Sequence, residues 1–216
     1  MIDATDWCER ATAKYKRGDY QGAIADFTKA IKLKPDFADA YNNRGTAKGA
    51  LGDYQGAIAD LTKAIELKPD FAMAYGNRGG TKYTLKDYQG AIADFNMAIK
   101  LKPDNAVAYS NRGLAKSPLE DYQGAIADLT KAIELKPDFA EAYFNRGIAK
   151  AHLKDYQGAV ADFTKAINLK PDDAEAYYNR GIEYAMLGQK DKARADFMRA
   201  IELNYSVPQE ALDLCK

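Results

Sequence analysis

Few residues of the sequence have the types and spacing that catalysis or metal binding requires. The single histidine is His152, and the two cysteines, Cys8 and Cys215, lie near opposite ends of the chain, so they form neither a metal-binding spacing nor a disulfide framework. None of the three serines stands beside a plausible catalytic base in the sequence, and no glycine-rich phosphate loop follows a strand pattern. The sequence therefore predicts that the protein is not an enzyme and needs no cofactor and no metal.

The charge of the chain also narrows the choice of partners. The 31 basic residues balance the 31 acidic residues, so there is no general attraction for nucleic acid or for an anionic membrane. No apolar run approaches the roughly 18 residues that a membrane-spanning helix needs, and the N-terminal MIDATDWCER lacks the pattern of a signal peptide. We expect a cytoplasmic protein that binds neither nucleic acid nor membrane.

Internal repetition dominates the sequence. The string DYQGA recurs every 34 residues, and the segment from Asp53 to Phe71 is repeated letter for letter from Asp121 to Phe139. Six units follow from this period: 4–37, 38–71, 72–105, 106–139, 140–173 and 174–207, with a short tail at 208–216. Copying is tolerated when each unit contacts mainly its neighbours, so the pattern predicts one solenoid domain over residues 1–216.

The second half of each unit has the pattern of an amphipathic helix. In YQGAIADLTKAIEL, Ala57, Leu61 and Ala64 follow the spacing of one buried face. Asp53 precedes this stretch as an N-cap, and Pro69 lies just beyond it, where a helix cannot easily continue.

The first half of each unit also predicts a helix, with less regular ends. Asp36 is placed to cap the helix of the second unit. In the fifth and sixth units the spacing predicts fuller capping boxes, formed by Asp138 with Glu141 and by Asp172 with Glu175. In the fourth unit, a proline within the last turn, Pro118, predicts a shortened or distorted helix.

The period and its fixed positions resemble the tetratricopeptide repeat family. Each unit has an aromatic residue at its fourth position, a small residue at its eighth and alanine at its twentieth and twenty-seventh, and the first five have proline at the thirty-second. The second unit shows the series as Tyr41, Gly45, Ala57, Ala64 and Pro69. The resemblance implies an all-α fold, a right-handed superhelical solenoid of six helix-turn-helix units, in which the first helices line a concave groove.

The repeats differ from one another mainly on one face of the first helix, at positions 2, 5, 9, 12 and 13 of each unit. A variable face on a fixed framework indicates a ligand-binding surface, and neutral variation of exposed sites is the alternative. One position beside this face is constant from the second unit onwards, where an asparagine recurs: Asn43, Asn77, Asn111, Asn145 and Asn179. A side-chain amide both donates and accepts, so this row can pair with an extended peptide backbone. The row resembles an asparagine ladder of the family, and the alternative is that each amide bonds the backbone of a neighbouring helix.

Apolar residues on the variable face gather in the last three units. They are Leu114, Phe144, Ile148, Tyr178 and Ile182, whereas the first three units have small and polar residues there. We expect an apolar anchor pocket toward that end. The alternative is that these side chains pack under the C-terminal tail, PQEALDLCK, or against a second copy of the chain.

A row of arginines follows the asparagines directly: Arg44, Arg78, Arg112, Arg146 and Arg180. Such a row suggests phosphate binding, but an aspartate recurs equally often on the second helix, which favours structural ion pairs. The sequence as a whole predicts a scaffold that binds an extended peptide or a segment of a partner protein. The alternative function is a structural module that forms homo-oligomers through its terminal repeats.

Overall fold

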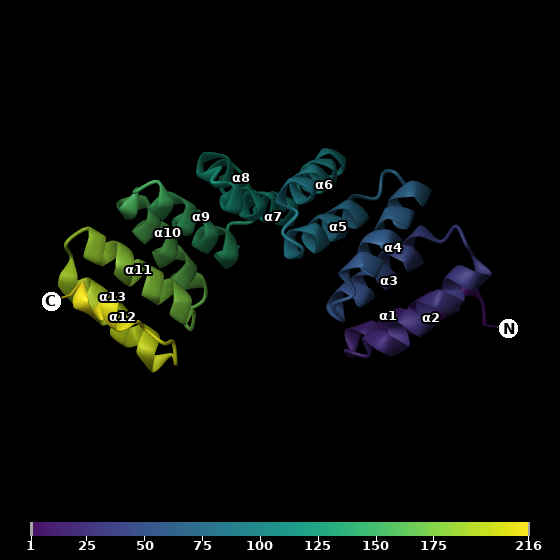
Figure 1. The fold of residues 1–216 in the computed structure, drawn as a ribbon, viewed down its shortest axis with the longest axis horizontal. Coiled ribbons are helices and arrows are strands. Elements are labelled where there is room, and N and C mark those ends of the chain that lie inside the picture. Colours follow the sequence, from purple (N-terminus) through teal and green to yellow (C-terminus); the bar gives the residue numbers. More distant parts are fainter. Residues whose placement is uncertain (1, 216) are drawn as a thin grey trace. The chain divides into compact units, whose positions relative to one another are not determined.

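All regular structure in residues 2–215, which the computed structural model describes, is helical (Figure 1). The first helices of the six repeats are α1 (Ala4–Lys16), α3 (Ala38–Ala50), α5 (Ala72–Thr84), α7 (Ala106–Lys116), α9 (Ala140–His152) and α11 (Ala174–Met186). The second helices are α2 (Tyr20–Leu33), α4 (Tyr54–Leu67), α6 (Tyr88–Leu101), α8 (Tyr122–Leu135), α10 (Tyr156–Leu169) and α12 (Lys190–Glu202). A short α13 (Gln209–Asp213) follows them. The prediction of an all-α fold of helix pairs is confirmed.

The chain forms two compact units, residues 1–108 and residues 109–216, and each is described by itself. In unit 1 the helices pack in chain order, from α1 on α2 through α5 on α6, and the first helices α1, α3 and α5 also contact one another in succession. In unit 2, α8 to α12 pack in the same order, and α9 contacts α11. The first helices within each unit therefore adjoin. The single domain over residues 1–216 stays a prediction.

The aspartate of each DYQG motif fixes the start of a second helix, as predicted. The Asp53 carboxylate accepts a hydrogen bond of 2.9 Å from the Gly56 backbone N–H. A Cβ on Gly56 would lie 2.1 Å from Asp53 Oδ2, so this approach requires glycine. The same cap is made by Asp19, Asp87, Asp121 and Asp155.

The first helices start differently from the prediction. The N-cap of α3 is Phe37, without a side-chain cap, so the predicted cap by Asp36 is wrong. The capping boxes of Asp138 with Glu141 and of Asp172 with Glu175 are also wrong, because the N-caps there are Phe139 and Asp173. An aromatic N-cap packs into the core, as Phe71 does beside Ala64 and Ile65, and this packing places the helix start one residue later.

Close contact between the two helices of a pair explains the small residue at the eighth position. A Cβ on Gly45 would lie 2.9 Å from Leu61 Cγ and 3.1 Å from the Ala57 carbonyl oxygen. Leu61, Ala57 and Ala64 are fully buried, which confirms the predicted face of the second helix. The core is thus a series of clusters between successive helices.

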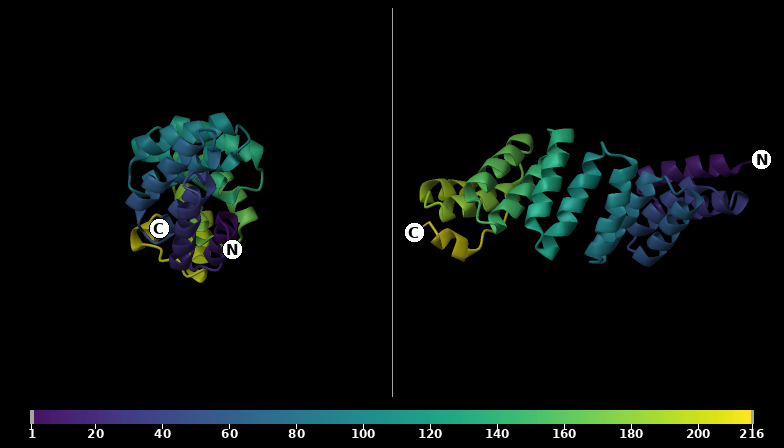
Figure 2. Two further views of the ribbon diagram at one scale, coloured as in Figure 1. Left: turned by 90° about the vertical axis from the view of Figure 1, so that its right-hand side faces the viewer. Right: turned by 90° about the horizontal axis from the view of Figure 1, so that it is seen from above.

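Two local features of unit 2 bear on the candidate site. Pro118 shortens α7 as predicted, since this helix has 11 residues against 13 in α9 and Ser117–Leu119 forms a 3-10 turn. After α12 the C-terminal segment turns back beside the last helix pair, where Ala211 and Cys215 pack with Phe197 (Figure 2).

Candidate functional site

The arginine row forms a structural framework, as the ion-pair prediction requires. Arg44 Nη2 lies 2.6 Å from Asp60 Oδ1, and its Nε lies 2.8 Å from Oδ2, so the pair is bidentate. Asp60 is 5% exposed. The same pair recurs in every repeat, including one that the sequence analysis did not count: Arg10–Asp26, Arg78–Asp94, Arg112–Asp128, Arg146–Asp162 and Arg180–Asp196.

A lysine one helical turn later completes the cluster in five repeats. Lys48 Nζ lies 2.8 Å from Asp60 Oδ2, and Lys14, Lys82, Lys116 and Lys150 make the equivalent contact. In the first repeat the hydrogen bond from Arg10 lowers the pKa of Asp26 to about 2, against the opposing effect of burial. Each carboxylate thus holds the arginine of its repeat in place, which gives the arginine row a structural role.

The same arginines also join neighbouring repeats. Arg78 Nη1 donates to Thr62 Oγ1 of the preceding repeat at 3.0 Å, and Arg146 donates to Thr130 at 3.0 Å. The guanidinium groups of Arg44, Arg78, Arg146 and Arg180 therefore bind their own second helix and the one before it. This explains why the position can stay constant while the face beside it varies.

In unit 1 the asparagine row is part of a side-chain network. Asn77 Nδ2 donates to Asn42 Oδ1 at 3.0 Å and to Thr46 Oγ1 at 3.3 Å. Asn42 Nδ2 in turn donates to Asn43 Oδ1 at 3.0 Å. The acceptors are side chains, not the helix backbone that the alternative predicted. Sequence reasoning placed Asn42 on the variable face, but its side chain is 1% exposed, and no other repeat has an asparagine at this position.

In unit 2 the row behaves differently. Asn179 Nδ2 donates to the Glu175 carbonyl of its own helix at 2.8 Å. The side chains of Asn111 and Asn145 are half-buried and have no hydrogen-bond partner among residues 2–215. These two amides are therefore available to a ligand.

The predicted apolar residues divide into two groups. Tyr178 and Ile182 pack against the cluster that contains Phe197 and the tail residues Ala211 and Cys215, which is the arrangement that the alternative described. Leu114, Phe144 and Ile148 are partly exposed on α7 and α9, and the Phe144 ring lies 5.6 Å from that of Phe163.

Exposure also divides the variable positions of the first helices. The residues at positions 2 and 13 are exposed in every repeat, and those at position 9 are partly exposed. At position 5 the prediction of a surface residue is wrong in three repeats, because Cys8, Asn42 and Ser110 are buried. The fifth position faces inward between helices, which the period alone did not reveal.

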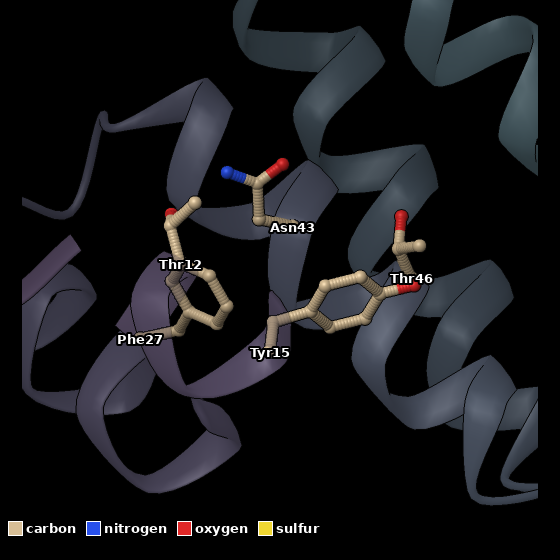
Figure 3. Close-up of a pocket in the computed structure, with 5 residues that line it drawn as sticks. All are labelled: Thr12, Tyr15, Phe27, Asn43 and Thr46. Carbon is tan, nitrogen blue, oxygen red and sulfur yellow. The ribbon is translucent and has the colours of Figure 1, made fainter. Parts of the chain in front are cut away.

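Between α1 and α3 there is a partly open cavity of about 80 Å³. Its lining residues are Thr12, Tyr15, Phe27, Asn43 and Thr46 (Figure 3). The sequence analysis placed a pocket among the later repeats and expected only small polar residues here, so this cavity was missed.

Two titratable side chains in unit 2 complete the description. His152 stacks on Tyr122, with ring centroids 4.4 Å apart and an interplanar angle of 8°. Glu183 is 6% exposed, its Oε2 atom has no hydrogen-bond partner, and burial raises its pKa to about 7. The sequence offered one indication of this buried carboxyl group, since Glu183 stands at the tenth position of its repeat, where four other repeats have alanine.

Among residues 2–215, no three His, Cys, Asp or Glu side chains cluster closely enough to hold a metal ion. None of the described helices is both long enough and apolar enough to cross a membrane.

Comparisons with known proteins agree with the geometry. A family model described as TPR repeat matches residues 11–52, 79–117, 119–154 and 151–188, and one described as Tetratricopeptide repeat matches 38–71 and 174–204. No curated protein matches the chain.

Solved structures share this fold. YrrB, described as a TPR protein with an unusual peptide-binding site, is 28% identical, with a TM-score of 0.70 over 88% of this chain and 95% of YrrB. MamA is 29% identical, with a TM-score of 0.69 over 76% of this chain and 96% of MamA. PilF of Pseudomonas aeruginosa, at 17% identity and a TM-score of 0.85 over 97% of this chain and 95% of its own, shows the likeness of fold alone.

Proposed function

Because the chain belongs to the tetratricopeptide repeat family, whose members generally mediate interactions between proteins, we propose that it binds an extended peptide segment of a partner protein on the face of its first helices. The observation that carries the proposal is the pair of half-buried, unpartnered amides of Asn111 and Asn145, 34 residues apart in consecutive repeats. An amide that donates and accepts can hold a peptide unit whatever side chains the peptide has.

Apolar side chains beside these amides would select the sequence of the peptide. Leu114 and Ile148 each follow an asparagine by three residues on the same helix, and this spacing puts both side chains on one face. Phe144 is a third contact, and Tyr178 and Ile182 would form the end of the surface next to the tail. In unit 1, Asn43 would donate to the peptide backbone, whereas Asn77, whose Nδ2 already donates to Asn42 and Thr46, would only accept.

The proposed activity is binding without catalysis. Repeats of this family are typically non-catalytic scaffolds, and the arginines and aspartates that recur from repeat to repeat are engaged in ion pairs and helix caps. The unusual peptide-binding site in the description of YrrB supports a peptide ligand for this chain too.

Selection from a random peptide library displayed on phage tests the proposal. The bait is the purified full chain, and clones that also bind an Asn111→Ala/Asn145→Ala variant are subtracted. An Asn168→Ala variant is the control, because that asparagine is exposed on the second helix α10. We expect enriched peptides with an apolar residue that bind the control but not the double variant. Equal binding to all three proteins would overturn the proposal.

Self-association through a terminal repeat is the second candidate function. Ile2, just before the first repeat, and Leu33 within it are 50% and 58% exposed, and both line a surface hollow. Ala13 is exposed in this repeat, whereas Ala47, Ala115 and Ala149 at the same position are fully buried. Light scattering over a range of concentrations separates the two functions, because only self-association makes the mass rise with concentration.

A further inference from the structure

The cavity between α1 and α3 has apolar walls although three of its five lining residues are Thr12, Asn43 and Thr46. Thr12 Oγ1 donates to the Cys8 carbonyl at 2.8 Å, and Thr46 Oγ1 donates to the Asn42 carbonyl at 2.9 Å. Both hydroxyl groups are thus satisfied within their own helices. Besides the amide of Asn43, the lining residues bring the threonine methyl groups and the rings of Tyr15 and Phe27, which favour an apolar occupant (Figure 3).

Comparison with the last repeat shows what kind of group fills this space. Ile182 and Phe197 are the counterparts of Thr12 and Phe27, at the ninth and twenty-fourth positions of their repeats. Ile182 packs against the cluster that contains Phe197, so an aliphatic side chain of the chain itself covers that ring. In the first repeat threonine replaces isoleucine, and a cavity lies beside Phe27.

A fixed hydrogen-bond donor lies at the rim of the cavity. Asn43 Oδ1 accepts from Asn42 Nδ2, and Asn42 is held in turn by Asn77, so the orientation of the Asn43 amide is set. Its Nδ2 has no acceptor among residues 2–215, and Figure 3 shows this nitrogen on the side of Thr12. A donor beside an apolar hollow suits a peptide, which presents a carbonyl oxygen next to each side chain.

We propose that this cavity is a subsite for one branched aliphatic side chain of valine size, with Asn43 Nδ2 donating to a backbone carbonyl of the same peptide. The volume of about 80 Å³ holds roughly three groups the size of a water or a methyl, which is the size of a valine side chain and less than the size of an indole ring. The inference rests on the proposed function, because it gives the first repeats a defined peptide side chain to bind.

Titration of the full chain with N-acetyl-valine N-methylamide, followed by NMR of the Asn43 side-chain amide and the Thr12 and Thr46 methyl groups, tests this subsite. We expect saturable shifts of these signals with a Kd on the order of millimolar, as suits so small a ligand. The tryptophan analogue should leave them unchanged. Absence of saturable shifts with the valine compound would overturn the proposal.

Substitutions locate the binding. Thr12→Ile should fill the cavity and weaken binding at least about tenfold, and Asn43→Asp should weaken it by removing the donor in an isosteric side chain. Thr84→Ile is the matched control, since Thr84 is exposed on α5 outside the cavity. Thermal unfolding verifies that each variant is folded. Undiminished binding to folded Thr12→Ile would contradict the subsite.

Failure of this subsite and failure of the proposed function give different results. Valine amide binding that Thr12→Ile abolishes, with no peptide selected in the display experiment, would keep the subsite and remove the role of Asn111 and Asn145. Selected peptides that need Asn111 and Asn145, with no binding of the valine compound, would keep peptide binding and remove the subsite.

Discussion

Among single residues, Glu183 occupies the position at which Ala47, Ala115 and Ala149 are fully buried in other repeats. The framework of this repeat thus surrounds a carboxyl group where its neighbours surround a methyl group. Burial disfavours the charged form, which raises the pKa of Glu183 from 4.5 to about 7.

We predict that Glu183→Ala stabilises the protein only above acidic pH. Below pH 4.5 the carboxyl is protonated in both the folded and the unfolded chain, so it causes no pH-dependent loss there. From 4.5 to about 7 the unfolded chain releases its proton first, and the free energy of unfolding of the wild type falls. The variant should therefore exceed the wild type by about 1 to 3 kcal/mol at pH 8 in urea unfolding.

The control for this prediction is Glu175→Ala on the same helix, where the side chain is exposed. Its free energy of unfolding should follow that of the wild type across the pH range. A Glu183→Ala variant whose advantage is equal at pH 4.5 and pH 8 would show that the carboxyl stays charged in the folded protein.

The framework ion pairs should contribute more stability than the ion pairs at the surface. Asp60→Asn leaves Arg44 and Lys48 beside a neutral amide and should lower the free energy of unfolding by about 2 to 3 kcal/mol. This loss is smaller than that expected for a fully buried pair, because the two cations are partly exposed. Glu66→Gln breaks an exposed pair with Lys63, 3.2 Å apart, and should cost under about 0.5 kcal/mol. Chemical unfolding of both variants tests this difference. Similar losses of stability in Asp60→Asn and Glu66→Gln would contradict it.

Among helices and turns, the fifteenth residue of each repeat, which lies between its two helices, takes a left-handed backbone conformation in all six repeats. Glycine occupies it in three, as Gly52 does with φ +83°, but Lys86, Glu120 and Lys154 have φ of 61° to 63°. A Cβ at Gly52 would meet nothing within 4 Å, so a side chain fits there without a clash. Glycine and the larger residues at this position therefore differ only in the backbone strain of the left-handed conformation.

Exchanging these residues should have opposite effects on stability. Lys86→Gly should raise the free energy of unfolding by about 0.5 to 1 kcal/mol, because relief of the strain exceeds the extra entropy of the unfolded chain. Gly52→Lys should lower it by a similar amount. Thermal unfolding of the two variants tests this prediction. If the free energy of unfolding changed in the same direction in both, backbone strain could not be the explanation.

The sequence predicted the second helices better than the first for a physical reason. The cap by Asp53 is local, since its partner Gly56 is three residues away, and periodicity was enough to find it. The start at Phe37 depends on burial of an aromatic ring, and the link from Asn77 to Asn42 joins residues of different repeats. Such contacts arise only when the repeats pack, so the asparagine and arginine rows could be found in the sequence but their hydrogen-bond partners could not.

At the scale of the whole molecule, each repeat contacts chiefly its neighbours within a unit, so stability should respond locally. The identical segments 53–71 and 121–139 allow the same substitution in two units. We predict that Asp60→Asn lowers amide hydrogen-exchange protection mostly in unit 1 and Asp128→Asn mostly in unit 2. Equal loss of protection along the whole chain in both variants would indicate a single cooperative unit.

The arginine–aspartate pairs recur in all six repeats, so the variable face of the first helices can change without loss of these pairs. The unpartnered amides of Asn111 and Asn145 lie beside that face. The most direct test is the Kd of a selected peptide for the wild type, for Asn111→Ala/Asn145→Ala and for Asn168→Ala, measured by fluorescence anisotropy. Two lost hydrogen bonds of about 1 kcal/mol each predict binding roughly 10- to 30-fold weaker for the double variant and unchanged for the control. A double variant that binds the peptide as tightly as the wild type would contradict peptide capture by these residues.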